Sequence, residues 1–161
     1  MELDSRYRNA QVLLLGASGF IGRWVAKALS ASGAKLTLVA RDKTADEQIF
    51  QRWAVEGKTV EADLSALEGV RSLIEAQPPQ IIFNLAGYGV DRSEQDPKLG
   101  KRINTELPIE LAAAIGDIPA GGSFTSVRRL STEWSGATWQ NRDPPNLAVG
   151  TAKRSWPPPV H

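Results

Sequence analysis

The chain has 161 residues, of which 42% are hydrophobic and 23% are charged, and its net charge at pH 7 is +1. This composition is typical of one globular domain with its own core, and so small a charge argues against nucleic acid as a partner. Cysteine is absent, which excludes disulfides, cysteine metal sites and thiol nucleophiles. No apolar run approaches the roughly 18–20 residues that cross a bilayer, and the start of the chain is unlike a targeting peptide. We therefore expect a cytoplasmic protein without a membrane partner.

The first part of the chain alternates short apolar runs with amphipathic ones. QVLLL, at residues 11–15, is typical of a strand that is covered on both faces. The next run, FIGRWVAKALSASG, places Ile21, Val25 and Leu29 on one stripe of a helix, which Gly33 would end. The pattern then predicts a strand at 35–40, a helix at 45–55 and a strand at 58–64.

The same alternation continues to about residue 116. LEGVRSLIEAQ predicts a helix ended by Pro78 and Pro79, and QIIFNLAG, at residues 80–87, predicts a fourth strand. Asp96 and Pro97 could cap a long helix, within which Pro108 predicts a kink or a division into two pieces. Because parallel strands need crossover connections, this order predicts an α/β fold with a doubly wound, Rossmann-like parallel sheet.

The turn after the first strand carries the most informative motif. GASGFIG spaces three glycines by three residues, directly after a strand and at the start of a helix. Such glycines allow a tight turn, the approach of backbone to a pyrophosphate, and close packing of helix on strand. The helix N-terminus also offers N–H groups to phosphates, although an ordinary strand–helix turn is the alternative. The residues expected to bind a dinucleotide cofactor here are Gly16, Ser18, Gly19, Phe20, Ile21 and Gly22.

The end of the second strand indicates which dinucleotide is bound. An acidic residue at this place accepts hydrogen bonds from the ribose of NAD, whereas an arginine suits the 2′-phosphate of NADP. The chain has Ala40 and Arg41 here, followed by Asp42. Arg41 can bind a phosphate through its planar guanidinium, or it is a solvated surface charge. We expect NADP as the cofactor, with NAD as the alternative.

Three motifs together resemble a known family. GASGFIG, the ADL at 62–64 and the NLAG at 84–87 resemble the extended short-chain dehydrogenases/reductases, and most of all their NAD-dependent epimerase/dehydratase branch. The resemblance covers about residues 10–121 and implies an oxidoreductase-type enzyme that acts on nucleotide-linked sugars. It also implies roles for single residues: Asp63 and Leu64 would contact the adenine, Leu85, Ala86 and Gly87 would line the nicotinamide ribose, and Asn104 would match the family's helix asparagine. Taken singly, Asp63 could instead cap a helix, and Asn84 could satisfy buried backbone.

The catalytic residues of that family have no counterpart here. The family uses a serine or threonine after the fifth strand, then a tyrosine four residues before a lysine, and the tyrosine is the acid/base. Tyr7 is followed four residues later by Gln11, and Tyr88 by Arg92. We therefore identify no catalytic residue and no metal site, and expect His161 to be a solvated terminal residue.

The segment from Gly122 onward has a different composition. It holds three of the five tryptophans, half of the ten prolines and five basic residues against two acidic ones. This composition is typical of the amino-acid sequence that results when a GC-rich gene is translated in the wrong reading frame. One choice of codons for GTAKRSW, at 150–156, encodes Tyr-Gly-Lys-Ala-Lys-Leu from the third base, which supplies the missing tyrosine and lysine. We hypothesise a frameshift near Gly121 that leaves an incomplete domain at 1–121, with about four strands, and an irregular, disordered tail at 122–161. A natural unstructured basic tail is the alternative.

Three functions are compatible with these features. The chain could be the cofactor half of an NADP-dependent epimerase, dehydratase or reductase, without catalytic activity of its own. It could be a non-catalytic NADP-binding module of the atypical short-chain type. It could also be a non-functional fragment, because a sheet that ends at the strand at 80–87 exposes an aggregation-prone edge.

Overall fold

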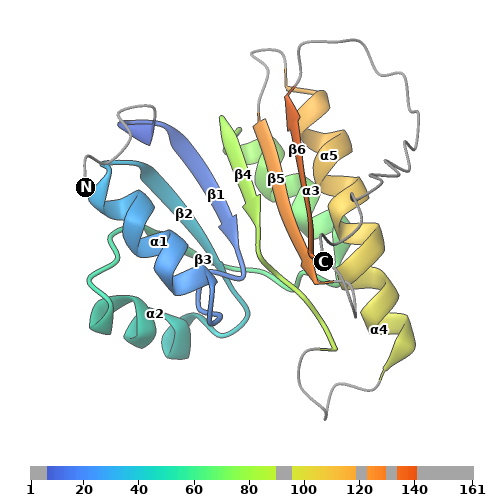
Figure 1. The fold of residues 1–161 in the computed structure, drawn as a ribbon, viewed down its shortest axis with the longest axis horizontal. Helices are drawn as coiled ribbons and strands as arrows, with labels where there is room; N and C mark the ends of the chain where they lie inside the picture. Colours follow the sequence, from blue (N-terminus) through green and yellow to red (C-terminus); the bar gives the residue numbers. More distant parts are fainter. Residues whose placement is uncertain (1–6, 90–95, 119–122, 130–133, 141–161) are drawn as a thin grey trace, which may run out of the picture.

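The computed structural model of the chain describes residues 7–89, 96–118, 123–129 and 134–140. These residues form one sheet with helices on both faces (Figure 1). The elements in chain order are β1 (Gln11–Leu15), α1 (Gly22–Ala31), β2 (Lys35–Ala40), α2 (Lys43–Arg52), β3 (Lys58–Glu61), α3 (Leu67–Ala76), β4 (Ile81–Asn84), α4 (Pro97–Lys101), the π-helix η2 (Arg102–Glu106), α5 (Leu107–Gly116), β5 (Ser123–Arg129) and β6 (Trp134–Gln140).

The strand order confirms the doubly wound, Rossmann-like class. The sheet runs β3-β2-β1-β4-β5-β6, and every neighbouring pair is parallel except β5 and β6. The chain moves from β1 to β2 and β3 on one side, then crosses to β4 on the other. The order therefore reverses between β1 and β4, and open α/β sheets bind ligands at the carboxyl ends of the strands at such a reversal.

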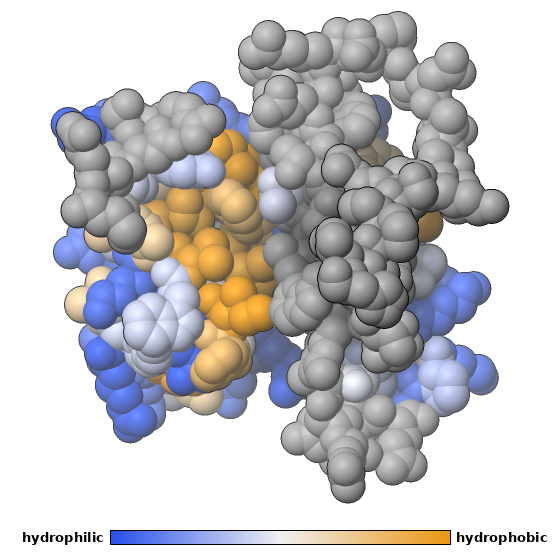
Figure 2. All heavy atoms as spheres, viewed as in Figure 1, coloured by the Kyte–Doolittle hydropathy of each residue, from blue (hydrophilic) through white to orange (hydrophobic). Residues whose placement is uncertain are grey.

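The core lies on both faces of the sheet, because β1 is central and buried. Leu13 and Leu15 pack on one face with residues of α3 and α5, and Leu14 packs on the other with residues of α1 and α2. Phe83 of β4 also lies on the α1 face and is half-buried, whereas Ile82 on the opposite face is buried. Figure 2 shows apolar side chains gathered on the α1 side of the molecule.

Several predicted boundaries agree with the structure, and others move for a local reason. Gly33 follows α1 with a φ of 81°, as expected of a residue that ends a helix. The helix predicted at 45–55 begins earlier, at Lys43, because the Asp42 side chain caps it. The third strand ends at Glu61 rather than residue 64, because Asp63 bends the chain in a side-chain-capped turn.

The long helix is divided around Pro108, as predicted. Asp96 caps α4 by accepting hydrogen bonds from the N–H groups of Lys98 and Leu99 at 2.8 and 3.3 Å. The π-helix η2 then joins α4 to α5, and the N–H of Leu107 reaches the carbonyl of Arg102, five residues earlier. Proline cannot donate the hydrogen bond that continues an α-helix, and a π turn before it lets the helix continue. π segments are frequent at functional sites.

Two strands lie in the region that was expected to be irregular. β5 pairs in parallel with β4 along Ile81–Asn84, and β6 pairs antiparallel with β5. The expectation of an irregular tail after about four strands is therefore wrong for 123–129 and 134–140, and β4 is paired on both sides, with β1 and β5. Thr125 and Val127 are residue types enriched in strands. Thr125 is paired with Phe83 of β4, and Val127 with Gly136 of β6. Residues 141–161 of the expected tail lie outside the described residues. Among the helices that the structure describes, none is long and apolar enough to span a membrane.

Candidate functional site

The turn between β1 and α1 rests directly on the backbone that follows β4. Gly16 has a φ of 73°, a conformation that favours glycine. A Cβ at this position would lie 2.7 Å from the backbone N of Ala86 and from the carbonyl carbon of Leu85. Neither atom can move without displacing the strand end. The glycine therefore allows the turn and the β4 loop to touch at the point where the strand order reverses.

The other two glycines of the motif face different surroundings. A Cβ on Gly22 would lie 1.9 Å from the carbonyl oxygen of Gly16, so the first residue of α1 must be glycine for the helix to pack on the turn. A Cβ on Gly19 would lie 3.2 Å from that same oxygen, which is tight but not prohibitive. Gly19 is exposed, and its N–H donates to the Gly16 carbonyl at 3.1 Å. Only at Gly19 does the lack of a side chain leave open space in front of the helix.

The N-terminus of α1 is open toward that space. Its N-cap, Ile21, makes no side-chain capping hydrogen bond, and the first turn holds no acidic residue. Phe20 and Ile21 are 80% and 43% exposed, and Ser18 is half-buried in the turn. The uncapped N–H groups and the positive end of the helix dipole favour an anion here.

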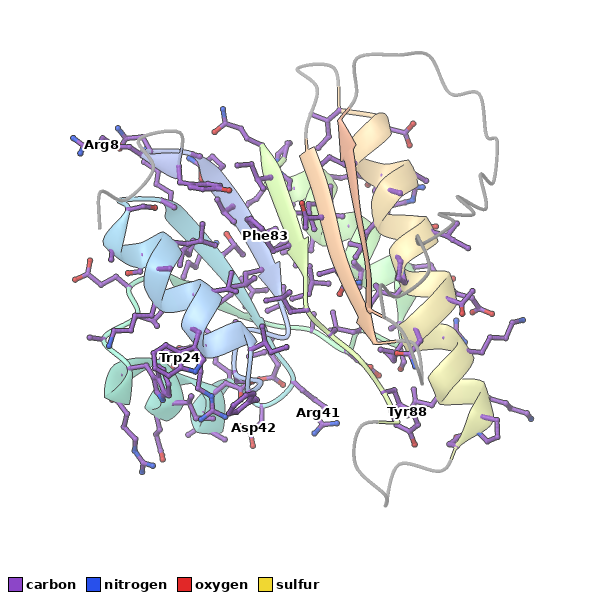
Figure 3. All side chains as sticks on the ribbon, in the orientation of Figure 1. Arg8, Trp24, Arg41, Asp42, Phe83 and Tyr88 are labelled. Carbon is purple, nitrogen blue, oxygen red and sulfur yellow. The ribbon has the colours of Figure 1, made fainter. Side chains whose placement is uncertain are left out.

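Arg41 and Asp42 follow β2 and have different environments. Arg41 is exposed and extends away from the sheet, between Asp42 and Tyr88 in the view of Figure 3. One carboxylate oxygen of Asp42 accepts a hydrogen bond from the N–H of Ala45 at 3.0 Å, which caps α2. The carboxylate is thus held at the start of a helix, while the guanidinium is free to meet a ligand.

Asp63 and Leu64 lie after β3 at the same edge of the sheet. The N–H and hydroxyl of Ser65 both donate to one carboxylate oxygen of Asp63, at 2.8 and 2.7 Å. These two hydrogen bonds lower the pKa of the Asp63 carboxyl; burial opposes them slightly, and the positive charges of Arg102 and Arg41 assist them. Ala66 is the N-cap of α3, so Asp63 shapes the preceding turn instead of capping the helix, and Leu64 packs against the core.

The hydrogen bonds of Asp63 lead to a first prediction. Ser65→Ala is expected to raise the pKa of the Asp63 carboxyl toward its ordinary value, because the hydroxyl donor is lost while the backbone donor remains. A depressed pKa stabilises the fold above the unfolded-state pKa, and this contribution disappears as the pH falls through the folded-state pKa. The contribution should therefore be smaller in the variant and be lost at a higher pH. An NMR titration of the carboxyl carbon, with Ser65→Thr as control, measures the shift, and identical titration curves would contradict it.

The residues after β4 are held by two asparagines. Asn84 is buried, and its side-chain oxygen accepts a hydrogen bond from the N–H of Ala86 at 3.2 Å. The N–H of Leu85 donates to the carbonyl of Leu15 at 3.0 Å, which extends the contact with β1. A Cβ on Gly87 would lie 4.0 Å from the side-chain oxygen of Asn104. The loop is thereby fixed against both β1 and η2.

Asn104 in η2 forms hydrogen bonds with both the N–H and the carbonyl of Tyr88. Its side-chain oxygen accepts from the Tyr88 N–H at 2.9 Å, and its side-chain nitrogen donates to the Tyr88 carbonyl at 2.8 Å. The Tyr88 hydroxyl in turn accepts a hydrogen bond from the N–H of Asp96 at 3.2 Å. The resemblance pointed to Asn104, whereas nothing in the sequence pattern pointed to Tyr88 as its partner.

The structure brings most of the predicted residues to one edge. The turn at residues 16–22 touches the loop at 85–87, and Arg41 acts electrostatically on Asp63. All of them follow the carboxyl ends of β1, β2, β3 or β4. This edge combines a helix N-terminus that suits an anion, an arginine and an ionised carboxylate, which together could hold a ligand with phosphate and hydrogen-bonding groups.

The sequence of the chain is similar to the sequences of known proteins. A sequence model of the NAD dependent epimerase/dehydratase family matches residues 12–141. The chain belongs to this family. The matched range extends past β4 and includes both β5 and β6.

Individual relatives of this epimerase/dehydratase chain are longer than it is. A dTDP-4-dehydrorhamnose reductase of Streptomyces griseus is 26% identical over 159 residues, which cover 94% of this chain and 45% of that protein. The bulky-bulky ketone specific alcohol dehydrogenase of Comamonas testosteroni is 30% identical, with a TM-score of 0.54, and the match covers 67% of this chain and 49% of that one. A metagenomic short-chain oxidoreductase in complex with NADP, at 22% identity, has a TM-score of 0.56 and shares the fold over 69% of this chain and 55% of its own. The chain thus spans about half the length of these proteins.

The tyrosines of this family member have structural surroundings of their own. The Tyr7 ring packs against Phe83, with 6.3 Å between the ring centres, and Tyr88 bonds Asp96 as described. Arg92 and His161 lie outside the described residues. Within the part of the chain that the structure describes, no three His, Asp or Glu side chains are grouped as metal ligands.

Proposed function

We propose that the chain binds a dinucleotide cofactor of the NAD(P) type at the carboxyl ends of β1, β2, β3 and β4. The observation that carries this proposal is the packing of the glycine turn. Gly16 touches the loop after β4 and Gly22 touches Gly16, so the uncapped start of α1 opens at the point where the strand order reverses. A pyrophosphate suits this position, because backbone N–H groups and the helix dipole favour an anion that can approach closely.

The two halves of the dinucleotide would lie on opposite sides of that turn. Asp63 and Leu64, after β3, would contact the adenine, and Leu85, Ala86 and Gly87, after β4, would line the nicotinamide ribose. Support for this placement comes from the position of both segments at the same sheet edge as the turn. The ionised state of Asp63 also suits an acceptor of N–H or O–H groups.

NADP is the dinucleotide that we propose, on the basis of Arg41. Its exposed guanidinium follows β2, where a 2′-phosphate would lie, and Asp42 is engaged as the cap of α2. If NAD is the cofactor instead, the second oxygen of Asp42 would accept from the ribose hydroxyls. NADP and NAD would both bind to the same edge of the sheet, and the contribution of Arg41 to binding distinguishes between the two cofactors.

Replacing Arg41 tests this preference. Arg41→Ala is expected to weaken NADP binding about tenfold or more, through the loss of a charge-assisted hydrogen bond, and to change NAD binding less than about twofold. Calorimetric titrations with NADP and with NAD measure the two affinities. Arg52→Ala, which removes an exposed charge from the last turn of α2, is the control. Equal losses for both cofactors would mean that Arg41 is only a surface charge.

The parent reaction that we propose is an epimerase, dehydratase or reductase reaction on a nucleotide-linked sugar. The family and the dTDP-4-dehydrorhamnose reductase relative support this substrate class. The chain itself lacks a tyrosine four residues before a lysine. It is therefore expected to show no turnover of such substrates even when cofactor is bound, because the tyrosine that exchanges the substrate proton in this family has no counterpart in the sequence. Turnover above a cofactor-free control, monitored at the absorbance of NADPH, would contradict this.

We also propose that the residues from Gly122 onward are out of frame. One choice of codons for 150–156 encodes the missing tyrosine and lysine in a shifted frame, which supports this idea. The nucleotide sequence of those codons tests it. Under this proposal the chain is the inactive cofactor half of an enzyme. A chain that binds NADP tightly and whose codons lack the shifted motif would instead be a non-catalytic NADP-binding module, and a chain without soluble yield would be a non-functional fragment.

A further inference from the structure

Arg23 occupies a place in α1 where a cation is unfavourable. It is the second residue of the helix, close to the positive end of the helix dipole. No acidic residue in the first turn compensates for it. A cation at this end weakens a helix unless another role requires it, and violations of local rules concentrate at functional sites.

The contacts of Arg23 connect it to the glycine turn. Its backbone N–H donates to the carbonyl oxygen of Gly19 at 3.1 Å, and its side-chain Nε donates to the same oxygen at 3.2 Å. This carbonyl belongs to the peptide group whose N–H comes from Phe20. In a planar trans peptide the C=O and N–H point in opposite directions. The two Arg23 donors hold the Gly19 carbonyl toward α1. The Phe20 N–H therefore points away from α1, into the space in front of its N-terminus.

Trp53, at the end of α2, fixes the guanidinium of Arg23. The central guanidinium carbon lies 5.3 Å from the centre of the Trp53 ring, within the range of a cation–π contact. Trp24 packs edge-on against the same ring, with centroids 4.6 Å apart and an interplanar angle of 85°. Arg23 and Trp53 are both half-buried. The side chain of Arg23 is thus held between the Trp53 ring, at the end of α2, and the glycine turn that precedes α1.

We propose that Arg23, held on Trp53, is a positioning residue that directs the Phe20 N–H toward the pyrophosphate of the bound dinucleotide. This inference rests on the proposed function and extends it by one residue outside the glycine motif. Arg23 acts by orienting the peptide group between Gly19 and Phe20, and Trp53, at the C-terminal end of α2, holds the Arg23 guanidinium in place.

Lys27 provides a matched control on the same helix. Its Nζ lies 5.9 Å from the centre of the Trp53 ring, and it stands one turn farther from the glycine turn than Arg23. Arg23→Met and Lys27→Met each remove one positive charge from α1, beside the same ring. Only Arg23→Met removes a donor to the Gly19 carbonyl, because methionine has no N–H group in its side chain. A difference between the two variants therefore reports positioning and not the general attraction of a cation for phosphate.

The experiment compares NADPH affinities, measured by the fluorescence of bound NADPH, for the unchanged chain and the two variants. Arg23→Met is expected to weaken binding about fivefold, as for the misplacement of one hydrogen bond to a charged group, and Lys27→Met less than about twofold. Adenosine 2′-monophosphate, which has no pyrophosphate, should bind Arg23→Met as well as it binds the unchanged chain. Arg23→Lys keeps the charge but has no donor at the position of Nε, and should resemble Arg23→Met.

The outcomes separate this inference from the proposed function. If the unchanged chain binds NADPH and the Arg23 and Lys27 variants lose affinity equally, or not at all, Arg23 has no positioning role. A parallel loss of adenosine 2′-monophosphate binding in Arg23→Met would show a merely structural role and would also overturn the inference. If the folded, unchanged chain does not bind NADPH, the proposed function itself is wrong.

Discussion

Replacing Gly22 by alanine is expected to abolish dinucleotide binding and to lower the free energy of unfolding by about 3 kcal/mol, at the upper end of the cost of overpacking. The added Cβ would lie 1.9 Å from the carbonyl oxygen of Gly16 and 2.9 Å from the Cα of Ala17. Both neighbours are backbone atoms, so no rotation of a side chain relieves the clash. The start of α1 must move away from β1, and the anion site at its N-terminus moves with it.

Chemical denaturation of Gly22→Ala measures the loss of stability. Gly69→Ala in α3 is the matched control, because its added Cβ would meet no atom within 4 Å. Alanine is the better helix former, so that control should gain about 0.5–1 kcal/mol. A Gly22→Ala variant as stable as the unchanged chain would show that the close packing of α1 on the turn is not required.

Replacing Gly19 by valine is expected to weaken dinucleotide binding about a hundredfold or more, as when a buried ligand contact is blocked, while the fold is kept. A Cβ at Gly19 meets only the Gly16 oxygen, at 3.2 Å, and the residue is exposed. The two methyl groups of valine would fill the space in front of α1, where we propose that the pyrophosphate lies. The loss of binding in this variant therefore comes from the site and not from unfolding.

NADPH fluorescence and thermal unfolding, measured on the same Gly19→Val sample, distinguish the two effects. A lower affinity with a nearly unchanged melting temperature is the expected pair of results. Unchanged affinity in a folded variant would remove Gly19, and with it the glycine turn, from the proposed site.

Much of the fold could be predicted because local patterns and tertiary packing agree. The apolar run of β1 is buried on both faces, and Gly33 ends α1 with a positive φ. Asp96 caps α4, and Pro108 marks the division of the long helix. In each case a single residue type has a physical role that depends little on distant contacts.

The strands after Gly121 could not be predicted, because their signal is not local. The composition of 123–140 is rich in arginine, tryptophan and serine and lacks a clear apolar alternation. β5 forms where the free edge of β4 offers hydrogen-bonding partners, and β6 adds to β5 as a hairpin. Pairing with an existing edge supplies what the sequence pattern lacks, since strand propensity depends strongly on context.

Some residues of the candidate site could likewise be predicted from the sequence, and others could not. The glycine turn and Arg41 were predicted because each follows the end of a predicted strand, and Asp63 was predicted from the resemblance to the family. The contact of Arg23 with Trp53 depends on how α1 and α2 pack, and the bond of Asn104 with Tyr88 joins residues 16 apart through the π turn. Neither pairing has a spacing that a sequence pattern would show.

The edge formed by the glycine turn and the loop after β4 is proposed to bind a dinucleotide, and isothermal titration calorimetry of the folded chain with NADPH detects such binding. We expect saturable binding of one NADPH per chain, tighter than that of NADH, and its loss in Gly19→Val. If a chain that shows a cooperative thermal transition gives no binding heat with NADPH, this edge is not a dinucleotide site.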